Sequence, residues 1–284
     1  MILPPLFKYL DLNGAKLTLG TRTFKHSAPS DFNDTKDLTI EAVFPEDLES
    51  ALVKLSNGFT DVILRNLSES PTCKSPLKEN VALIQRVYRT NLEAANIVKN
   101  EIAKGKEQPV FDVEQMRTHV VERVIEINDF MHGFRVLCAT THRNSDEMWE
   151  RYADRRRGVV LRIEPSLAKD SKFRLFRPVV YREKRPPLYD DTLDFISHGL
   201  FGDQEAQHKA TIEKIIYAKT LEWQYENEYR LAIAVRKSER PWNTLPYHAE
   251  EITELSLGRA MTDQDKEEVV RLALATNPKM LICH

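Results

Sequence analysis

Residues 221–235 read Leu-Glu-Trp-Gln-Tyr-Glu-Asn-Glu-Tyr-Arg-Leu-Ala-Ile-Ala-Val, and this stretch decides the fold class that we expect. Apolar and aromatic residues occupy the odd positions except Asn227, and mostly polar residues occupy the even positions. Because side chains alternate between the two faces of a β-strand, this period of two predicts a strand with one apolar face. Glu226, Glu228 and Arg230 would then share the other face, with neighbouring side chains ~6–7 Å apart.

The face that carries Glu226 and Glu228 allows two interpretations. Two carboxylates at that separation raise each other's proton affinity, and a nearby cation such as Arg230 offsets the effect. The alternative is a solvated strand face whose charges keep a sheet edge from aggregating. Ala232 and Ala234 lie on the same face, and two small apolar residues there indicate that something packs over this face or that a ligand approaches it closely.

The rest of the chain predicts further strands and two long helices. Short apolar or alternating runs predict strands at residues 6–10, 21–26, 135–139, 159–163, 173–181 and 280–282. The Asn13-Gly14 pair predicts a turn after the first strand. Apolar residues at steps of three and four predict helices over residues 81–102 and 116–131 that pack on the sheet. We therefore expect one α+β domain over residues 1–284, with a twisted, largely antiparallel split sheet and a helical cap or insertion at about 79–132.

The composition of the chain excludes several classes of protein. Its 284 residues include 41 Lys and Arg against 43 Asp and Glu, a formal net charge of −2, which excludes a polycation that wraps nucleic acid non-specifically. No apolar run approaches the ~20 residues that span a bilayer, so no membrane association is expected. Cys73, Cys138 and Cys283 are far apart and indicate neither a disulfide framework nor a metal site. We expect a cytoplasmic protein.

Several motifs that would identify an activity are missing from the sequence. It contains no GxGxxG after a strand, no GxxxxGK(S/T), no HExxH and no GxSxG. The sequence therefore offers no dinucleotide-binding loop, phosphate loop, zinc-protease helix or hydrolase elbow. The eight histidines are scattered singly, and each is interpreted as a surface or core residue rather than a ligand, so no metal ion is expected.

A second segment carries hydroxyl groups, aromatic rings and arginines in succession. Thr140 and Thr141 end a predicted strand, where their hydroxyls can point into a cleft. Trp149 and Tyr152 share one face of a predicted helix, and core packing is the favoured interpretation of both. The arginines at 155–157 are interpreted as a solvated helix end favoured by the helix dipole, with contact to phosphate or nucleic acid as the alternative.

Four short segments stand in a recognisable order along the chain. They are Lys8-Tyr9, Phe32-Asn33-Asp34, Met148-Trp149-x-x-Tyr152-Ala153 with Gly158, and Trp223-x-x-Glu226-x-Glu228-x-Arg230. In this order they resemble a widespread prokaryotic domain family of unknown function, and the resemblance extends from Leu6 to about Gly258. The family often has Pro after the Phe-Asn-Asp segment, where this chain has Thr35.

Lys8-Tyr9, Thr140-Thr141 and Glu226-x-Glu228 follow one another along the chain in an order that also resembles the ADP-ribosyltransferase superfamily. Such enzymes have a basic or polar residue on an early strand, a Ser/Thr-bearing strand in the middle and a Glu-x-Glu on a late strand, although the early Arg or His and the middle serines of many of them are missing here. The resemblance implies an ADP-ribosyltransferase-like fold with NAD as the substrate and no metal ion. It implies that Glu228 and Glu226 are catalytic and that NAD is bound by Lys8, Tyr9, Thr140, Thr141 and Arg230.

The chemistry of NAD assigns a role to each of these residues. Glu228 would bond the ribose 2-hydroxyl and stabilise the oxocarbenium-like cation that forms as the nicotinamide–ribose bond breaks. Glu226 would orient or deprotonate the acceptor. Thr140 or Thr141 would supply a hydroxyl that holds Glu228. Tyr9 would supply a ring that stacks on nicotinamide. Lys8 or Arg230 would supply a charge for the pyrophosphate or for pairing with a glutamate.

The function that we expect is therefore NAD-dependent ADP-ribosyl transfer to protein or nucleic acid. Such an enzyme fits a bacterial toxin or antiphage defence effector, which can require a neutralising partner protein. Two alternatives stay open. The chain can be a non-catalytic interaction module in which Glu226, Glu228 and Arg230 form a salt-bridge lattice, or a metal-dependent nuclease or hydrolase that uses Glu226, Glu228 and Asp34 as metal ligands.

Overall fold

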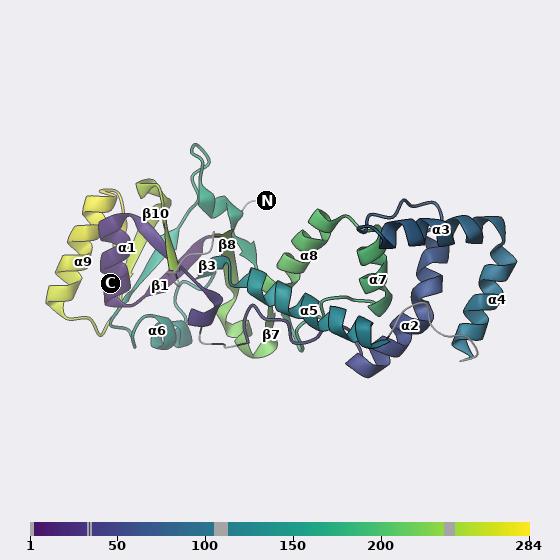
Figure 1. Cartoon of the computed structure of the whole chain (residues 1–284). Helices are drawn as coiled ribbons and strands as arrows, with labels where there is room; N and C mark the ends of the chain where they lie inside the picture. Colours follow the sequence, from purple (N-terminus) through teal and green to yellow (C-terminus); the bar gives the residue numbers. More distant parts are fainter. Residues whose placement is uncertain (1–2, 33, 35, 105–112, 236–241) are drawn as a thin grey trace. The chain divides into compact units, whose positions relative to one another are not determined.

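The computed structural model describes residues 3–32, 34, 36–104, 113–235 and 242–284, and the chain divides into two compact units (Figure 1). The first, which we call the sheet unit, comprises residues 1–38, 130–184 and 216–284. The second, the helical unit, comprises residues 39–129 and 185–215. The helical unit is thus inserted into the sheet unit at two places in the sequence, and the expected insertion at about 79–132 overlaps the longer of the two stretches.

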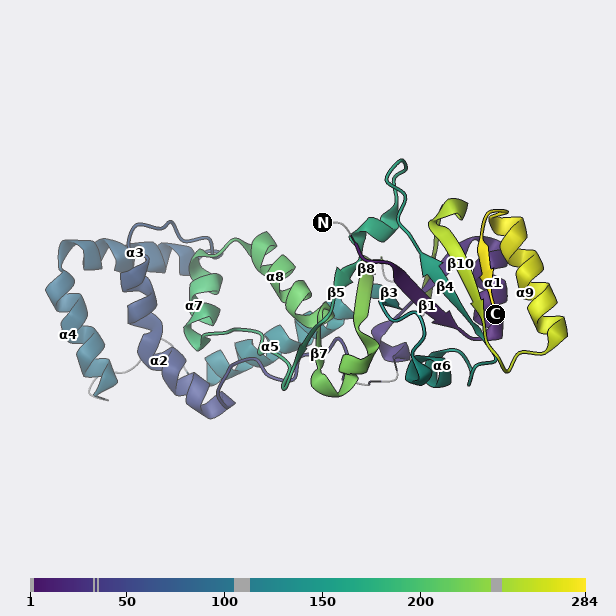
Figure 2. The same cartoon turned by 180° about the vertical axis from the view of Figure 1, so that it is seen from behind.

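The sheet unit is built on an open sheet (Figures 1 and 2). Its described strands are β1 Leu6–Leu10, β2 Thr23–Ser27, β3 Phe134–Thr140, β4 Val159–Ile163, β5 Arg177–Pro178, β8 Glu228–Ala234, β9 Trp242–Pro246, β10 Ile252–Leu257 and β11 Leu281–Cys283. Neighbours follow the order β11-β10-β4-β1-β3-β2-β9, with β8 paired to β3 and β5 to β8. The pairs are antiparallel apart from β10 with β11, so the expectation of an α+β fold with a largely antiparallel sheet is confirmed.

The sheet divides at β3. One edge of β3 pairs with β8 over the whole length of both strands. The other edge meets β1 at the pair Phe7–Thr140 and meets β2 at the pair Ser27–Val136. Cys138 lies between these two pairs and lines a pocket of the sheet unit. A separate parallel pair, β6 (Val180–Arg182) with β7 (Ala218–Thr220), lies in the same unit.

Helices cover both faces of this sheet. On one face α1 (Leu12–Thr21) and α9 (Asp263–Thr276) lie side by side (Figure 1). Leu6 and Leu161 belong to the core under these helices, whereas Phe7 and Val160, one residue away on the same strands, pack on the other side with Trp149 of α6 (Asp146–Tyr152). The period of two in the strands therefore builds two cores. Short 3-10 turns lie at Pro29–Asp31 (η1), Lys172–Leu175 (η2), Leu221–Glu226 (η3) and Ala249–Glu251 (η4).

The helical unit has an apolar core of its own. Its helices are α2 Leu48–Arg65, α3 Leu77–Thr90, α4 Leu92–Ala103, α5 Val113–Met131, α7 Thr192–Phe201 and α8 Gln204–Ile216. Leu55 and Ile63 of α2, Val81 of α3, Val120 of α5 and Ile196 of α7 are buried together. Among the helices that the structure describes, none is both long and apolar enough to cross a membrane.

The turn predicted at Asn13-Gly14 is wrong, because a helix begins there. Asp11 precedes α1 in an extended conformation, and its Oδ1 accepts a hydrogen bond of 2.6 Å from the backbone N–H of Gly14. This side-chain cap satisfies one of the unpaired N–H groups of the first helical turn. The pair Asn13-Gly14 is therefore part of the first turn of a helix.

Two further predictions of secondary structure are also corrected. The single helix expected over residues 81–102 is two helices, α3 and α4, because Asn91 ends α3 and its Oδ1 accepts a hydrogen bond of 3.0 Å from Ala94 N in the first turn of α4. Val81 of α3 and Val120 of α5 pack in the helical core, whereas Phe130 at the end of α5 packs against Phe134 of β3. The strand expected at 173–181 is a 3-10 turn followed by the short strands β5 and β6, which Pro178 helps to interrupt because it has no N–H.

Candidate active site

The stretch from Leu221 to Val235 folds differently from the prediction. Residues 221–226 form the 3-10 turn η3, Asn227 adopts a left-handed conformation with φ 40°, and the strand β8 begins only at Glu228. The side chain of Asn227 donates a hydrogen bond to Thr141 Oγ1, and its N–H donates to the carbonyl of Gln224 at 3.1 Å. The predicted strand is correct from Glu228 onward and wrong before it, because a residue in the left-handed region ends the extended chain.

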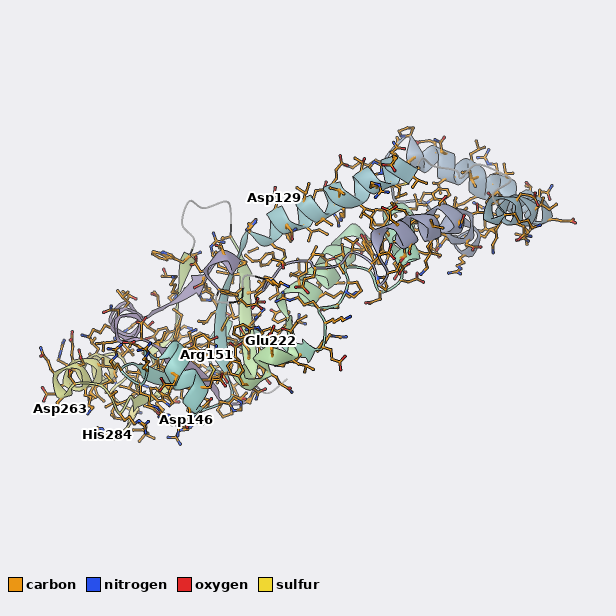
Figure 3. The ribbon with its side chains drawn as sticks, turned by 90° about the horizontal axis from the view of Figure 1, so that it is seen from below. Asp129, Asp146, Arg151, Glu222, Asp263 and His284 are labelled. Carbon is orange, nitrogen blue, oxygen red and sulfur yellow. The ribbon has the colours of Figure 1, made fainter. Side chains whose placement is uncertain are left out.

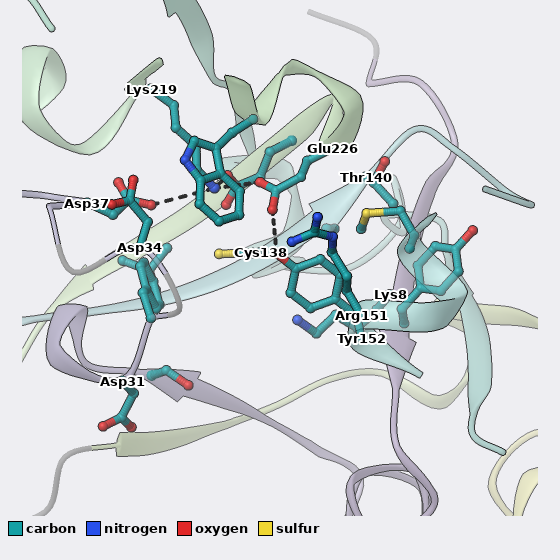
Figure 4. Close-up of a pocket in the computed structure, with 18 of the residues that line it drawn as sticks. Lys8, Asp31, Asp34, Asp37, Cys138, Thr140, Arg151, Tyr152, Lys219 and Glu226 are labelled. Atoms are coloured by element: carbon teal, nitrogen blue, oxygen red, sulfur yellow. Dashed lines mark hydrogen bonds and ion pairs between the residues drawn. The ribbon is translucent and has the colours of Figure 1, made fainter. Parts of the chain in front are cut away.

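Glu226 and Glu228 nevertheless reach the same pocket, which lies within the sheet unit. Its volume is about 440 Å³. Its lining comes from several elements, among them β1, β3, α6, β7, η3 and β8, and includes Lys8, Cys138, Tyr152, Lys219, Glu226 and Glu228 (Figure 4). The turn at Asn227 thus brings the two glutamates together from two different elements.

Arg230 lies beneath the pocket and is completely buried. Its guanidinium group donates five hydrogen bonds of 2.5 to 3.0 Å, two to Glu228, two to Asp37 and one to the carbonyl of Ile216. These bonds use all five N–H donors of the side chain. Arg230 therefore positions Glu228 and Asp37 and has no donor left for a ligand, which matches its expected pairing with a glutamate and not the expected contact with the cofactor.

Glu228 is held as an anion by two cations. It is 5% exposed, and besides Arg230 it lies 3.3 Å from the Lys219 ammonium group. Burial alone would raise the pKa of Glu228, but the charges of Arg230 and Lys219 outweigh burial and lower the pKa far below its usual range. A carboxylate at the edge of a pocket thus keeps its negative charge at every physiological pH.

Lys219, the second cation, is a residue that the sequence did not single out. It is buried, pairs with Glu226 and Glu228, lies 3.7 Å from Asp37 and stands 4.5 Å from the centre of the Trp223 ring. Burial lowers the pKa of an ammonium group, but the neighbouring glutamates outweigh burial and raise the pKa of Lys219. Lys219 therefore remains charged and holds the two glutamates in place.

Glu226 has the opposite pKa shift from Glu228. Its Oε1 accepts a hydrogen bond from the Tyr152 hydroxyl, and its Oε2 accepts one from Lys219 (Figure 4). Burial and the charge of Glu228 raise the pKa of Glu226 above its usual range, although Lys219 acts against them. A pair of neighbouring carboxyl groups with separated pKa values is the arrangement that assigns one group to proton transfer and the other to charge stabilisation.

The other residues predicted for NAD are divided between the pocket and the core. Lys8 and Thr140 line the pocket, and Thr140 lies opposite Glu228 in the β3–β8 pairing. Thr141 does not line the pocket but accepts the hydrogen bond from Asn227, so it anchors the turn between the two glutamates. It therefore acts on Glu228 only through the backbone.

Tyr9 is a core residue rather than an open stacking platform. It is 4% exposed, its ring packs edge-on against Trp149 at 5.4 Å, and its hydroxyl donates to the carbonyl of His142 and accepts from Ser145 N–H, both at 3.0 Å. The predicted stacking of Tyr9 on nicotinamide therefore has no support in its packing, although atoms of Tyr9 form part of the pocket wall. Trp149 is likewise buried, as expected, whereas Tyr152 on the same helix reaches the pocket.

The carboxylates of the nuclease alternative are engaged by cations. Glu226 and Glu228 accept hydrogen bonds from Lys219 and Arg230. Asp34 also lines the pocket. Among the described residues, no group of three or more His, Cys, Asp or Glu side chains is arranged to hold a metal ion. Asn33 and Thr35, which belong to the resemblance around Asp34, lie outside the described residues.

The three arginines at 155–157 form an unusual loop and not a helix end. Helix α6, which begins at Asp146 and carries Arg151 in its last turn (Figure 3), ends at Tyr152. Asp154, Arg155 and Arg156 then adopt φ values of 47°, 53° and 66°. This left-handed conformation costs roughly 1–3 kcal/mol for each residue that is not glycine. Surrounding contacts must hold this loop, and it fixes the end of the helix that carries Tyr152.

Two residues of the site, Asp37 and Lys219, were missed for a common reason. They come from separate segments and meet only in the folded chain, where Lys219 also pairs with Glu226 and Glu228. Trp223 belongs to the quoted segment and lies on the same 3-10 turn as Glu226, but its place in the pocket was not predicted. The one local signal that could have pointed to Asp37 and Lys219 is a charged residue next to a buried one, as at Lys219, which follows the buried Ala218.

Comparison with known proteins identifies a family that matches part of the chain. Residues 148–231 match the family described as Protein of unknown function (DUF2971). The matched stretch begins at the segment of Met148, Trp149 and Tyr152 and contains Lys219, Glu226, Glu228 and Arg230. The expected resemblance to a domain family of unknown function is confirmed for these residues. No curated protein and no solved structure matches the chain.

Proposed function

We propose that the sheet unit transfers ADP-ribose from NAD to a macromolecular acceptor. The observation that carries the proposal is the glutamate pair: Glu226 and Glu228 reach one pocket from the two sides of the Asn227 turn, and their pKa values are shifted in opposite directions. Transfer of a glycosyl group is favoured by a negative charge beside the developing cation and by a separate group that takes the proton of the attacking acceptor. The pocket offers both.

The proposed reaction assigns one step to each glutamate. The bond between ribose C1′ and the nicotinamide nitrogen breaks, its electron pair leaves with neutral nicotinamide, and C1′ becomes an oxocarbenium-like cation. Glu228 accepts a hydrogen bond from the ribose 2′-hydroxyl and stabilises this cation through its charge. The acceptor atom then attacks C1′, and its proton passes to the carboxylate of Glu226.

The surroundings of the pair supply the other contacts that NAD would need. Lys8 and Arg151 line the pocket and offer positive charge for the pyrophosphate. Trp223 also lines it and provides an aromatic ring in place of the buried Tyr9. Tyr152 donates its hydrogen bond to Glu226 and thereby orients the proton acceptor. A protein or nucleic-acid acceptor, a role as a bacterial toxin or antiphage defence effector, and a neutralising partner protein belong to the same proposal.

The direct test is NAD turnover by the purified chain. We expect the full-length protein, incubated with adenylate-labelled NAD and bacterial lysate in the presence of EDTA, to release nicotinamide and to transfer label into a protein or RNA fraction. Release without transfer in buffer alone would show hydrolysis by water. No nicotinamide release under any of these conditions, or RNA cleavage that appears only when Mg²⁺ or Mn²⁺ is restored, would contradict the proposal.

Glu226→Gln separates transfer from hydrolysis. We expect this change to lower transfer on the order of 10²-fold, because the amide cannot accept the acceptor's proton, while hydrolysis of NAD by water remains measurable. Glu222→Gln is the matched control, since Glu222 lies on the same 3-10 turn but is exposed (Figure 3). Nicotinamide release and label transfer are measured for both variants. Equal loss of both reactions in Glu226→Gln would remove Glu226 from the acceptor step.

One observation favours a second candidate, the non-catalytic interaction module. The five hydrogen bonds of Arg230 and the contacts of Lys219 make the glutamates part of a buried network that can serve stability alone. In that case changes to the network would act through unfolding, and NAD would not be consumed.

A further inference from the structure

A second cavity lies wholly within the helical unit. Its volume is about 790 Å³, within the range of pockets that hold small organic molecules. Helices α2, α3, α5 and α7 form its walls, and spaces between the helices of a bundle are common ligand sites. One side of the cavity is apolar and consists of Phe59, Val81, Ile84, Ile196 and Leu200.

The wall formed by α5 is mostly polar. Gln115, His119, Glu122, Arg123 and Glu126 line the cavity, and Met116 is the apolar member of this wall. Val120 and Ile127 of the same helix are buried, whereas Gln115, His119 and Glu126 are exposed. The helix thus turns an apolar face into the core, and its polar residues line the cavity from the solvent side. A ligand in the cavity would therefore meet apolar side chains on its inner side and polar groups toward solvent.

Arg123 is the cation of this wall that is best placed for a ligand. Its side chain is 27% exposed, and it contacts the hydroxyl of Tyr189, another residue of the cavity. Arg123 forms an ion pair of 3.3 Å with Glu126, whose side chain is 66% exposed. Such an exposed pair is weak. An anion that enters the cavity can therefore replace Glu126 at the guanidinium group.

We propose that this cavity binds a small amphipathic anion, with the apolar part of the ligand against α3 and α7 and its carboxylate or other anionic group on Arg123. The site is separate from the pocket of the sheet unit, and the inference does not depend on NAD chemistry. A binding site for a small molecule gives the helical unit a function of its own.

The test compares two probes with the same chain and different head groups, decanoate and decanamide, by titration calorimetry on the full-length protein. We expect decanoate to bind with one site and at least roughly tenfold more tightly than decanamide, because a hydrogen bond to a charged group is stronger than one to a neutral group. Arg123→Gln should remove this preference by weakening the binding of decanoate and leaving that of decanamide unchanged. Micelle formation is avoided by working below the critical concentration of the probe.

A variant that fills the cavity tests its location. Gly199 lines the cavity in α7, and a Cβ atom there would meet no atom within 4 Å. Gly199→Leu should therefore fold normally and weaken the binding of both probes by roughly tenfold or more, since the leucine side chain takes space that the ligand needs. Gly20→Leu, the same change at a helical glycine of the sheet unit with equally open surroundings, is the control. The proposal is overturned if decanoate does not bind saturably, if Arg123→Gln binds it equally well, or if Gly199→Leu behaves like Gly20→Leu.

Discussion

Glu228→Gln is expected to reduce nicotinamide release from NAD by roughly 10³-fold, the size of effect seen when a group that stabilises transition-state charge is removed. The amide keeps the shape of the side chain and can still accept a hydrogen bond from the ribose 2′-hydroxyl. It lacks the negative charge that faces the developing cation, and that charge is the property that Arg230 and Lys219 maintain in the wild type. The measurement is the rate of nicotinamide release at saturating NAD.

This variant also perturbs the fold, so it needs a matched control. Glu228 is buried and pairs with two cations. Removing its charge leaves those buried cations without a partner, which lowers the free energy of unfolding by on the order of a few kcal/mol. Asp37→Asn removes the other carboxylate of Arg230, at a similar cost, without touching the residue assigned to the ribose. We expect both variants to melt at a lower temperature, and Glu228→Gln alone to lose turnover at a temperature where both are folded.

The outcome distinguishes the enzyme from the interaction module. If turnover falls in proportion to the melting temperature in both variants, Glu228 acts only through stability. If the wild type releases no nicotinamide at all, the network is structural and the proposed activity is wrong. A loss confined to Glu228→Gln would place the charge of Glu228 at the reaction itself.

The sequence predicted the position of the glutamate pair better than its structural basis. The spacing of Glu226, Glu228 and Arg230 indicated that the three act together, and they do lie together. The prediction attributed this to one strand face, whereas a left-handed residue at Asn227 separates a 3-10 turn from the strand. Period-two patterns do not reveal one residue with positive φ, so the local path of the chain was not predictable from alternation alone.

The partners of the pair depend on tertiary contacts that no local pattern contains. Asp37 and Arg230 are far apart in sequence, and only the sheet and its connections bring them within hydrogen-bond distance. Tyr9 shows the same dependence, because its place beside Lys8 in the sequence gave no sign that its ring would pack against Trp149. The fold class was predictable from strand periodicity, but the division of the helical unit into two inserted stretches was not.

The loop after α6 gives the second large effect that we expect, in Gly158→Ala. A Cβ atom at Gly158 would lie 2.0 Å from the carbonyl oxygen of Leu10 and 3.0 Å from Asp11 Cα, and these are backbone atoms that no side-chain movement relieves. The strand that carries Leu10 pairs with β4 directly after this glycine, so the clash falls at the junction of β1 and β4. We expect the free energy of unfolding to fall by about 3 kcal/mol.

Gly20→Ala is the control, because the substitution is identical and the surroundings are open. Gly20 lies in α1, and a Cβ atom there would meet nothing within 4 Å, so alanine should stabilise the helix by roughly 0.5–1 kcal/mol. Urea unfolding of both variants gives the two free energies. Gly158 also accepts a hydrogen bond of 3.0 Å from Gly258 N–H and follows the left-handed residues Asp154 to Arg156, so the clash acts on the loop that fixes α6 and its Tyr152. A Gly158→Ala protein as stable as the wild type would contradict the close approach of the two backbones, and with it the account of how the loop holds Tyr152 against Glu226.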